Sequence, residues 1–206
     1  MTTTKTVTLA ALAAMALAGC ASMSDEEATA RAMQVMKASF SERGQAKLDR
    51  LSQDEAQKLC SKAPGTELDK AVLEKIEKTN FTAIAYPADG KLMGDWRRGE
   101  RIAQTGTGMQ YSDNPNVPSG ANCYACHQLS KAEISFGTIG PSLLNFGKLR
   151  GTSEAIQRYT YGKIYNAQAF TACSNMPRFG HNRILTERQM KDLTALLLDP
   201  ESPVNK

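Results

Sequence analysis

Two thiols and one imidazole lie within five consecutive residues of this chain, at Cys123, Cys126 and His127. Thiols at this spacing can each add to one vinyl group of a porphyrin, and the adjacent histidine then offers a ring nitrogen to the iron. Covalent bonds of this kind replace a large apolar pocket as the means of keeping the cofactor. The spacing therefore predicts one covalently bound haem c, attached through Cys123 and Cys126, with His127 as an axial iron ligand.

The same spacing also occurs in zinc sites and in dithiol redox pairs. A zinc site would need further ligands, and outside the N-terminal 20 residues the chain offers only Cys60, Cys173 and His181. A dithiol redox motif normally belongs to a βαβ unit, and the sequence lacks that pattern. Haem attachment is therefore the interpretation that the sequence favours.

The second axial ligand has to come from elsewhere, and Asn175-Met176-Pro177 offers the strongest candidate. The thioether of Met176 is a soft ligand that favours reduced iron and raises the reduction potential, which suits an electron acceptor. Pro177 would hold the segment in an extended conformation. His181 is an alternative ligand, and Met176 could instead be a packing residue. Two methionines that precede the haem motif are weaker candidates: Met93 and Met109.

A proline after the attachment motif bears on the orientation of His127. In c-type cytochromes a proline carbonyl in this position commonly accepts the N–H of the ligand imidazole, which orients the ring and raises its basicity. The segment Ile139-Gly140-Pro141-Ser142-Leu143 follows the motif at such a place. We therefore expect the carbonyl oxygen of Pro141 to accept a hydrogen bond from His127.

The first 20 residues indicate export. Lys5 precedes an apolar stretch from Val7 to Ala18, which is too short to span a bilayer and fits a signal peptide. Leu17-Ala18-Gly19-Cys20 resembles a bacterial lipobox, in which the cysteine is lipidated; ordinary cleavage beside a chance cysteine is the alternative. We expect a periplasmic protein, with a lipid anchor at Cys20 if the lipobox is used, since no other apolar run has membrane length.

Export also bears on the two remaining thiols, Cys60 and Cys173. Leftover cysteines usually pair outside the cytoplasm, and such a disulfide would tie the N-terminal region to the Met176 segment. The alternative is functional, with Cys173 reaching the iron or carrying sulfur as a reactive thiolate. Both interpretations stay open on the sequence alone.

Helices are expected on both sides of the haem motif. Asp95 would cap a helix from Trp96 to Ala103, and a loop rich in Gly, Ser, Asn and Pro would follow from Gly106 to Asn122. The capping box Thr186-Glu187-Arg188-Gln189 would begin an amphipathic helix that stops at Pro200. The haem motif would therefore lie between two helices.

Residues 21–92 are predicted to form a helical N-terminal extension. Ser52-Gln53-Asp54-Glu55 fits a capping box for a helix through Cys60, which Pro64-Gly65 would end. A second helix is predicted after Thr66 by apolar residues at helical spacing: Leu68, Val72, Leu73 and Ile76. A helical spacer is the favoured interpretation, and a docking extension for a partner subunit is the alternative.

Length and charge restrict the function further. The 206 residues suffice for one domain with an extension and are too few for two full domains, so we expect one functional centre. Lys and Arg number 25 against 21 Asp and Glu, a formal net charge of +4. That excess falls short of the basic surface of a nucleic-acid-binding protein.

Together these motifs resemble the SoxX family, the small c-type cytochrome subunits of the SoxAX complex of bacterial sulfur oxidation. The resemblance covers residues 94–206, and its motifs are Gly94-Asp95, Cys123 to His127, Ile139 to Leu143, Asn175 to Gly180, Asp192 to Leu198 and Ser202 to Asn205. The attachment motif is common to c-type cytochromes, so the Met176 segment and the C-terminal residues carry the specificity. The N-terminal extension, the loop before the motif and the additional cysteine pair depart from the shortest members.

The resemblance implies an all-α fold, with a class I cytochrome c-like helical domain over residues 93–206. The helical extension at 21–92 and the signal peptide at 1–20 would precede this domain. It also implies a heterodimer with SoxA, which binds thiosulfate at a haem with a modified cysteine ligand and joins it oxidatively to a cysteine of the carrier SoxYZ. The present chain would be the non-catalytic electron-transfer subunit of this L-cysteine S-thiosulfotransferase complex. It would pass electrons singly to a soluble cytochrome or an oxidase.

Two other functions remain open. One is a free-standing or lipid-anchored mono-haem electron shuttle unrelated to sulfur oxidation, which would lack a tight partner. The other is an enzyme that binds a small ligand at an open iron site, which would lack ligation by Met176.

Overall fold

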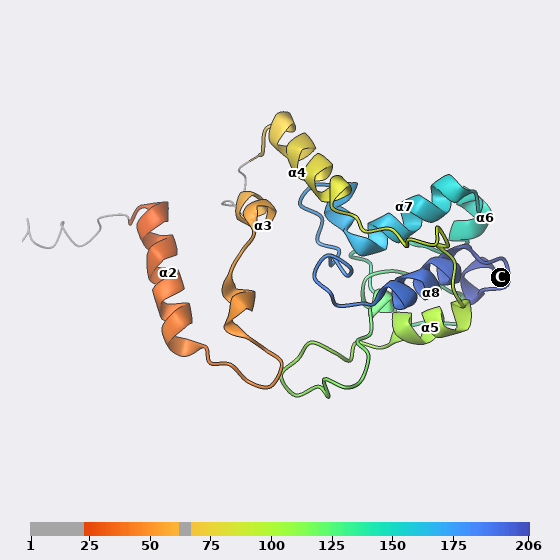
Figure 1. Ribbon diagram of the computed structural model, residues 1–206, viewed down its shortest axis with the longest axis horizontal. Coiled ribbons are helices and arrows are strands. Elements are labelled where there is room, and N and C mark those ends of the chain that lie inside the picture. Colours follow the sequence, from red (N-terminus) through yellow and green to blue (C-terminus); the bar gives the residue numbers. More distant parts are fainter. Residues whose placement is uncertain (1–22, 62–66) are drawn as a thin grey trace, which may run out of the picture. The chain divides into compact units, whose positions relative to one another are not determined.

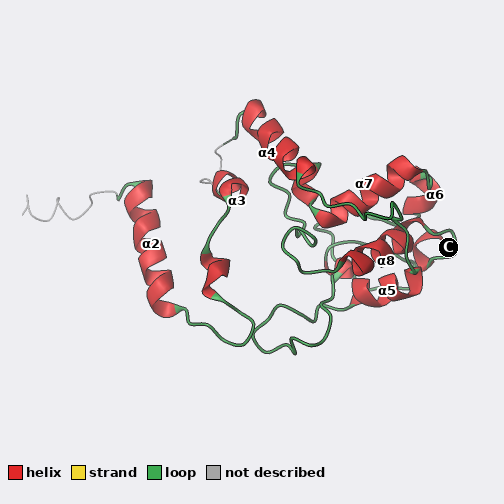
Figure 2. Ribbon diagram, in the orientation of Figure 1, coloured by secondary structure: helices red, strands yellow, loops and turns green. Residues whose placement is uncertain are grey.

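The computed structural model describes residues 23–61 and 67–206 of the chain. Helices joined by loops make up this part, which contains no β-strand (Figure 2). The predicted all-α fold is confirmed. The expected signal peptide, Cys20 and the helix stop at Pro64-Gly65 lie outside the described residues. None of the described helices has the length and apolar character needed to cross a membrane.

The chain divides into two compact units, residues 1–42 and 43–206. The described part of the first unit contains helix α2 (Asp25–Ser39), which Figure 1 labels. None of the residues of α2 is buried. A capping box begins this helix, because Ser24 and Glu27 each accept the backbone N–H of the other. The domain boundary expected between residues 92 and 93 stays a prediction, since the second unit includes both sides of it.

The second unit is organised around two helices that lie side by side, α5 (Trp96–Gln104) and α8 (Glu187–Leu198) (Figure 1). Glycine permits their close approach, since a Cβ atom at Gly99 would lie 2.2 Å from the carbonyl oxygen of Asp192. The buried carboxylate of Asp192 accepts the N–H of Asp95 and two N–H groups of Arg98, each at 2.8 Å. These bonds offset the cost of burying a charge between the helices.

Both helices begin where the sequence predicts. The side chain of Asp95 accepts the N–H of Arg97 at 2.9 Å, and Thr186 forms the expected capping box with Gln189. Helix α8 ends at Leu198, two residues before the proline that was expected to stop it. The long segment between α5 and the haem motif is irregular, as its Gly, Ser, Asn and Pro content indicates.

Two further helices, α6 (Phe146–Arg150) and α7 (Glu154–Tyr165), follow the haem motif, and α7 packs against α8. The core of this unit is apolar and includes Leu129, Tyr161, Ile164, Phe179, Met190, Leu193 and Leu196. The C-terminal turn η5 (Pro203–Asn205) closes it, because the side-chain oxygen of Asn205 accepts the N–H of Gly147 at 2.9 Å.

The N-terminal part of the second unit contains the turn η2 (Leu48–Leu51) and helix α3 (Glu55–Cys60). Helix α3 ends where the sequence predicts, but the N-cap predicted at Ser52 is wrong. Asp54 caps the helix instead, because its carboxylate accepts the N–H of Gln57 at 2.8 Å and Gln57 accepts the N–H of Asp54 at 2.9 Å. Asp is as good an N-cap as Ser, so two overlapping capping boxes compete here.

Helix α4 (Lys70–Thr82) packs on the turn η4 (Ala167–Ala169), which follows α7. Ile76 from the predicted apolar stripe is buried, and the buried side-chain amide of Asn166 donates to Asn80 at 2.7 Å. An amphipathic helix needs cover for its apolar face, and the second unit supplies that cover here. Helix α4 is therefore packed into the second unit, and the role of the N-terminal extension as a spacer or as a docking extension stays a prediction.

Because α5 and α8 approach closely, we expect one methyl group added at Gly99 to destabilise the fold. Gly99→Ala would force the added Cβ into the backbone of α8, and we expect the free energy of unfolding to fall by about 1–3 kcal/mol. Chemical denaturation followed by circular dichroism measures this loss. Arg101→Ala on the exposed side of α5 is the control, with an expected change within about 0.5 kcal/mol. Equal stabilities for the two variants would contradict this account of the helix pair.

Candidate functional site

The groups of the predicted haem motif lie on and directly after one tight turn, η3 (Cys123–Ala125). The backbone N–H groups of Cys126 and His127 both donate to the carbonyl oxygen of Cys123, at 3.1 and 2.9 Å. Asn122 introduces the turn in the left-handed conformation, with a φ of 46°, which Asn tolerates better than most residues. The turn keeps both thiols and the imidazole on one short segment, as attachment to a single porphyrin requires.

The ring of His127 is held from one side. Its Nδ1 atom lies 2.7 Å from the carbonyl oxygen of Pro141, and a carbonyl can only accept, so Nδ1 carries the proton. The lone pair of Nε2 is therefore left for a metal, and the predicted role of Pro141 is confirmed. Gly140 leaves room for this contact, because a Cβ atom there would lie 2.1 Å from Cε1 of the ring.

An apolar pocket brings together residues that are far apart in the sequence. Cys123, His127 and Met176 contribute to its lining, and the remaining lining residues are all apolar: Leu129, Leu143, Ile164, Phe179, Leu193, Leu196 and Leu197. An imidazole, a thioether and a thiol among leucines fit an iron porphyrin, whose macrocycle is apolar and whose iron accepts nitrogen and soft sulfur ligands. The donor set therefore suits haem c.

The two candidates for the second axial ligand differ in position. Met176 is half-buried against the core and lines the same pocket as His127. His181 lies outside that lining, with its Nε2 atom 3.9 Å from a carboxylate oxygen of Asp54. Burial lowers the pKa of His181, Arg178 lowers it further, and Asp54 raises it. The geometry favours Met176, whose ligation stays a prediction.

The two leftover cysteines form a disulfide, with an S–S distance of 2.00 Å between Cys60 and Cys173. The predicted pairing is confirmed. The alternative of a reactive thiolate or iron ligand at Cys173 is wrong for this structure, because its sulfur is already bonded. Cys123, in contrast, is a thiol whose pKa burial raises to about 12.

One buried polar cluster beneath the motif was not predicted. The hydroxyl of Tyr124, within the attachment motif, lies 2.9 Å from Oε1 of Glu100 and 3.3 Å from Oγ of Ser130. Burial raises the pKa of Glu100, even though its bonds to Tyr124 and Gln104 lower it. These residues come from α5, the motif and the following loop, and no spacing in the sequence connects them.

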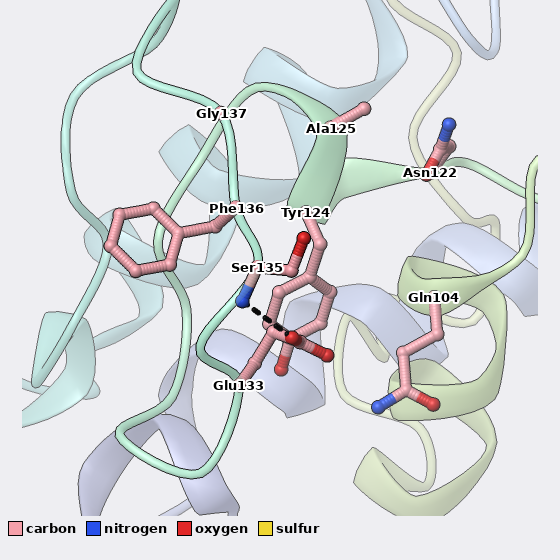
Figure 3. Close-up of a pocket in the computed structure, with 8 residues that line it drawn as sticks. All are labelled: Gln104, Asn122, Tyr124, Ala125, Glu133, Ser135, Phe136 and Gly137. Carbon is pink, nitrogen blue, oxygen red and sulfur yellow. Dashed lines mark hydrogen bonds between the residues drawn. The ribbon is translucent and has the colours of Figure 1, made fainter.

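A second pocket opens on that side of the motif (Figure 3). It is lined mainly by polar side chains and backbone: Gln104, Asn122, Tyr124, Ala125, Glu133, Ser135, Phe136 and Gly137. Figure 3 shows the carboxylate of Glu133 accepting the backbone N–H of Ser135, a hydrogen bond of 2.8 Å. The lining of this pocket contains no histidine, methionine or cysteine, so the apolar pocket is the candidate haem site.

Comparison with known proteins agrees with this geometry. The cytochrome c family model matches residues 116–199, which include the attachment motif and Met176. A protein of Aquifex aeolicus described as an uncharacterized lipoprotein is 38% identical over 157 residues, which cover 75% of this chain and 74% of that protein.

The attachment motif predicts one haem that stays with the polypeptide. In the protein purified from a host that attaches haem c, we expect the mass of one haem on each chain after denaturation and acid-acetone extraction, measured by mass spectrometry. Cys123→Ser together with Cys126→Ser removes both thioether bonds, so the extracted chain should lose that mass. Complete extraction of haem from the unaltered protein, or a second haem, would contradict the prediction.

Proposed function

We propose that this chain, which contains a cytochrome c family domain over residues 116–199, is the electron-transfer subunit of a SoxAX-type sulfur-oxidation complex. The observation that carries the electron-transfer part is the apolar pocket that brings Cys123, His127 and Met176 together. When bound there, the haem would supply an iron that takes up and releases one electron at a time.

The residues of the chain determine how such an iron would behave. Pro141 keeps the proton on Nδ1 of His127, so Nε2 is free to bind metal and the imidazole becomes more basic. The thioether of Met176 favours the reduced state, and the leucines around it exclude water and so disfavour added charge. These features support a relatively high reduction potential, which suits an electron acceptor.

The role in sulfur oxidation rests on the motifs of residues 94–206 that resemble the SoxX family. In this proposal the chain pairs with SoxA, in which thiosulfate is joined to a cysteine of SoxYZ. The electrons released there pass through the haem of this chain to a soluble cytochrome or an oxidase. SoxA contributes the active site, and this chain contributes no catalytic residue.

A second candidate is a lipid-anchored electron shuttle without a tight partner. The lipoprotein description of the Aquifex aeolicus relative and the lipobox-like sequence ending at Cys20 favour it. An anchored subunit of a SoxAX-type complex combines both ideas, so anchoring alone does not decide between them. The presence of a stable partner does, and both candidates place the chain in the periplasm.

Met176 as an axial ligand leads to a spectroscopic prediction. Met176→Ala removes the thioether, so the weak near-infrared sulfur-to-iron charge-transfer band of the ferric protein should disappear and the reduction potential should fall. Haem attachment should be unaffected, because the two thioether bonds remain. Met109→Ala is the matched control, since Met109 lies outside the lining of the apolar pocket. A band that survives Met176→Ala would require another sulfur ligand and would contradict ligation by Met176. An unaltered protein without the band would instead make His181→Ala the next variant.

Partner and anchor can be tested in one preparation. We expect a tagged chain, isolated from cells grown on thiosulfate, to retain a second haem-containing subunit through size-exclusion chromatography. A chain that elutes alone with full haem content would favour the free-standing shuttle. If Cys20 is lipidated, Cys20→Ser should move the chain from the membrane fraction to the soluble fraction, and unchanged membrane association would count against the anchor.

A further inference from the structure

The segment that contains Met176 has little structure of its own. We call residues 171–178 the methionine loop, which belongs to no helix and is half-exposed over most of its length. Its internal hydrogen bonds are few, with the N–H of Ser174 donating to Thr171 at 3.2 Å and that of Met176 to the Ser174 hydroxyl at 3.3 Å. Such a loop opens easily unless contacts from outside hold it.

Contacts from helices α3 and α4 hold the loop on both sides of Met176. Before it, Cys173 is bonded to Cys60 at the end of α3. The backbone N–H of the preceding residue, Ala172, donates to the carboxylate of Glu77 on α4 at 3.0 Å.

The contact after Met176 is an ion pair. The guanidinium of Arg178 donates to Oδ2 of Asp54, the N-cap of α3, at 2.6 Å. The Arg178 side chain is 6% exposed, so this carboxylate balances a charge that is largely removed from water. Removing one partner of such a pair leaves the other charge buried and unpaired, which is strongly destabilising.

We propose that α3 and α4 form a clamp that keeps Met176 on the iron, with Asp54, Arg178 and the Cys60–Cys173 disulfide as its positioning groups. This inference rests on the proposed function, in which Met176 is the axial ligand. The clamp assigns a role to residues that precede the matched cytochrome c region, which begins at residue 116. It acts by lowering the fraction of molecules in which the loop is open.

The clamp makes a quantitative link between loop opening and ligand exchange. Added imidazole can bind ferric iron only when Met176 has left it, so the apparent affinity for imidazole scales with the open fraction. A change that weakens the clamp raises the open fraction. The apparent dissociation constant for imidazole should then fall by the same factor by which the open fraction rises.

Two variants remove separate parts of the clamp from the full-length holoprotein. Cys60→Ser with Cys173→Ser removes the cross-link, which joins residues 113 positions apart. Asp54→Asn removes the charge that faces Arg178 and keeps an oxygen to accept the N–H of Gln57, so the cap of α3 survives. We expect each to lower the apparent dissociation constant for imidazole at least about tenfold and to weaken the charge-transfer band.

Two controls separate positioning from general stability. Glu55→Gln breaks the neighbouring but exposed pair between Glu55 and Lys75, which does not touch the loop, and should leave imidazole binding unchanged. Leu92→Ala shortens a buried core side chain that lies outside the lining of the apolar pocket and outside the methionine loop, so it should destabilise the fold and also leave imidazole binding unchanged. If Asp54 and the disulfide acted only on overall stability, every variant with a lowered free energy of unfolding would show a similar change in imidazole binding.

The outcomes are distinguishable. Tighter imidazole binding in the two clamp variants, with both controls unchanged, supports the clamp. An intact band with unaltered imidazole binding in Asp54→Asn overturns the clamp and leaves ligation by Met176 standing. A wild-type protein without the band overturns ligation by Met176, and the clamp with it. If the double serine variant fails to fold, Asp54→Asn decides alone, because it keeps the disulfide.

Discussion

The close packing of α5 against α8 sets the position of the candidate haem pocket. Leu193, Leu196 and Leu197 of α8 line that pocket, so the place of α8 determines where an apolar cofactor can lie. That place depends on the absence of a side chain at Gly99 and on the buried carboxylate of Asp192. Because Asp192 is bonded to the start of α5 as well as to Arg98, the register of the two helices is fixed along with their distance.

Local patterns in the sequence predicted much of this structure. The caps at Asp95 and Thr186 need residues no more than three positions away, and both were found from spacing alone. The contact between His127 and Pro141 was also predictable, because c-type cytochromes share it. The cap of α3 was misplaced by two residues, since Ser52 and Asp54 both satisfy the local rule and the choice depends on where the helix begins in the fold.

Most contacts between residues far apart in the sequence could not be predicted from the sequence. Pairing of Cys60 with Cys173 could be expected because exported cysteines usually pair, which is a chemical rule independent of the fold. The ion pair of Asp54 with Arg178 follows no such rule, since either charge has many candidate partners in a chain with 46 charged residues of the four common types. No local rule predicts the hydrogen bond between Tyr124 and Glu100 either, because the two residues meet only after α5 is folded against the motif.

The two sides of the candidate site are therefore held in different ways. His127 is fixed by its own turn and by Pro141, all within one short stretch of chain, so its geometry can form before most long-range contacts. Met176 comes from an irregular loop, and its place depends on the disulfide and the buried ion pair to residues more than 100 positions earlier. Because loop closure over such a distance is costly in entropy, the segment that contains the proposed second ligand is the one that needs a cross-link. A disulfide beside the Met176 segment, rather than beside His127, is consistent with that difference.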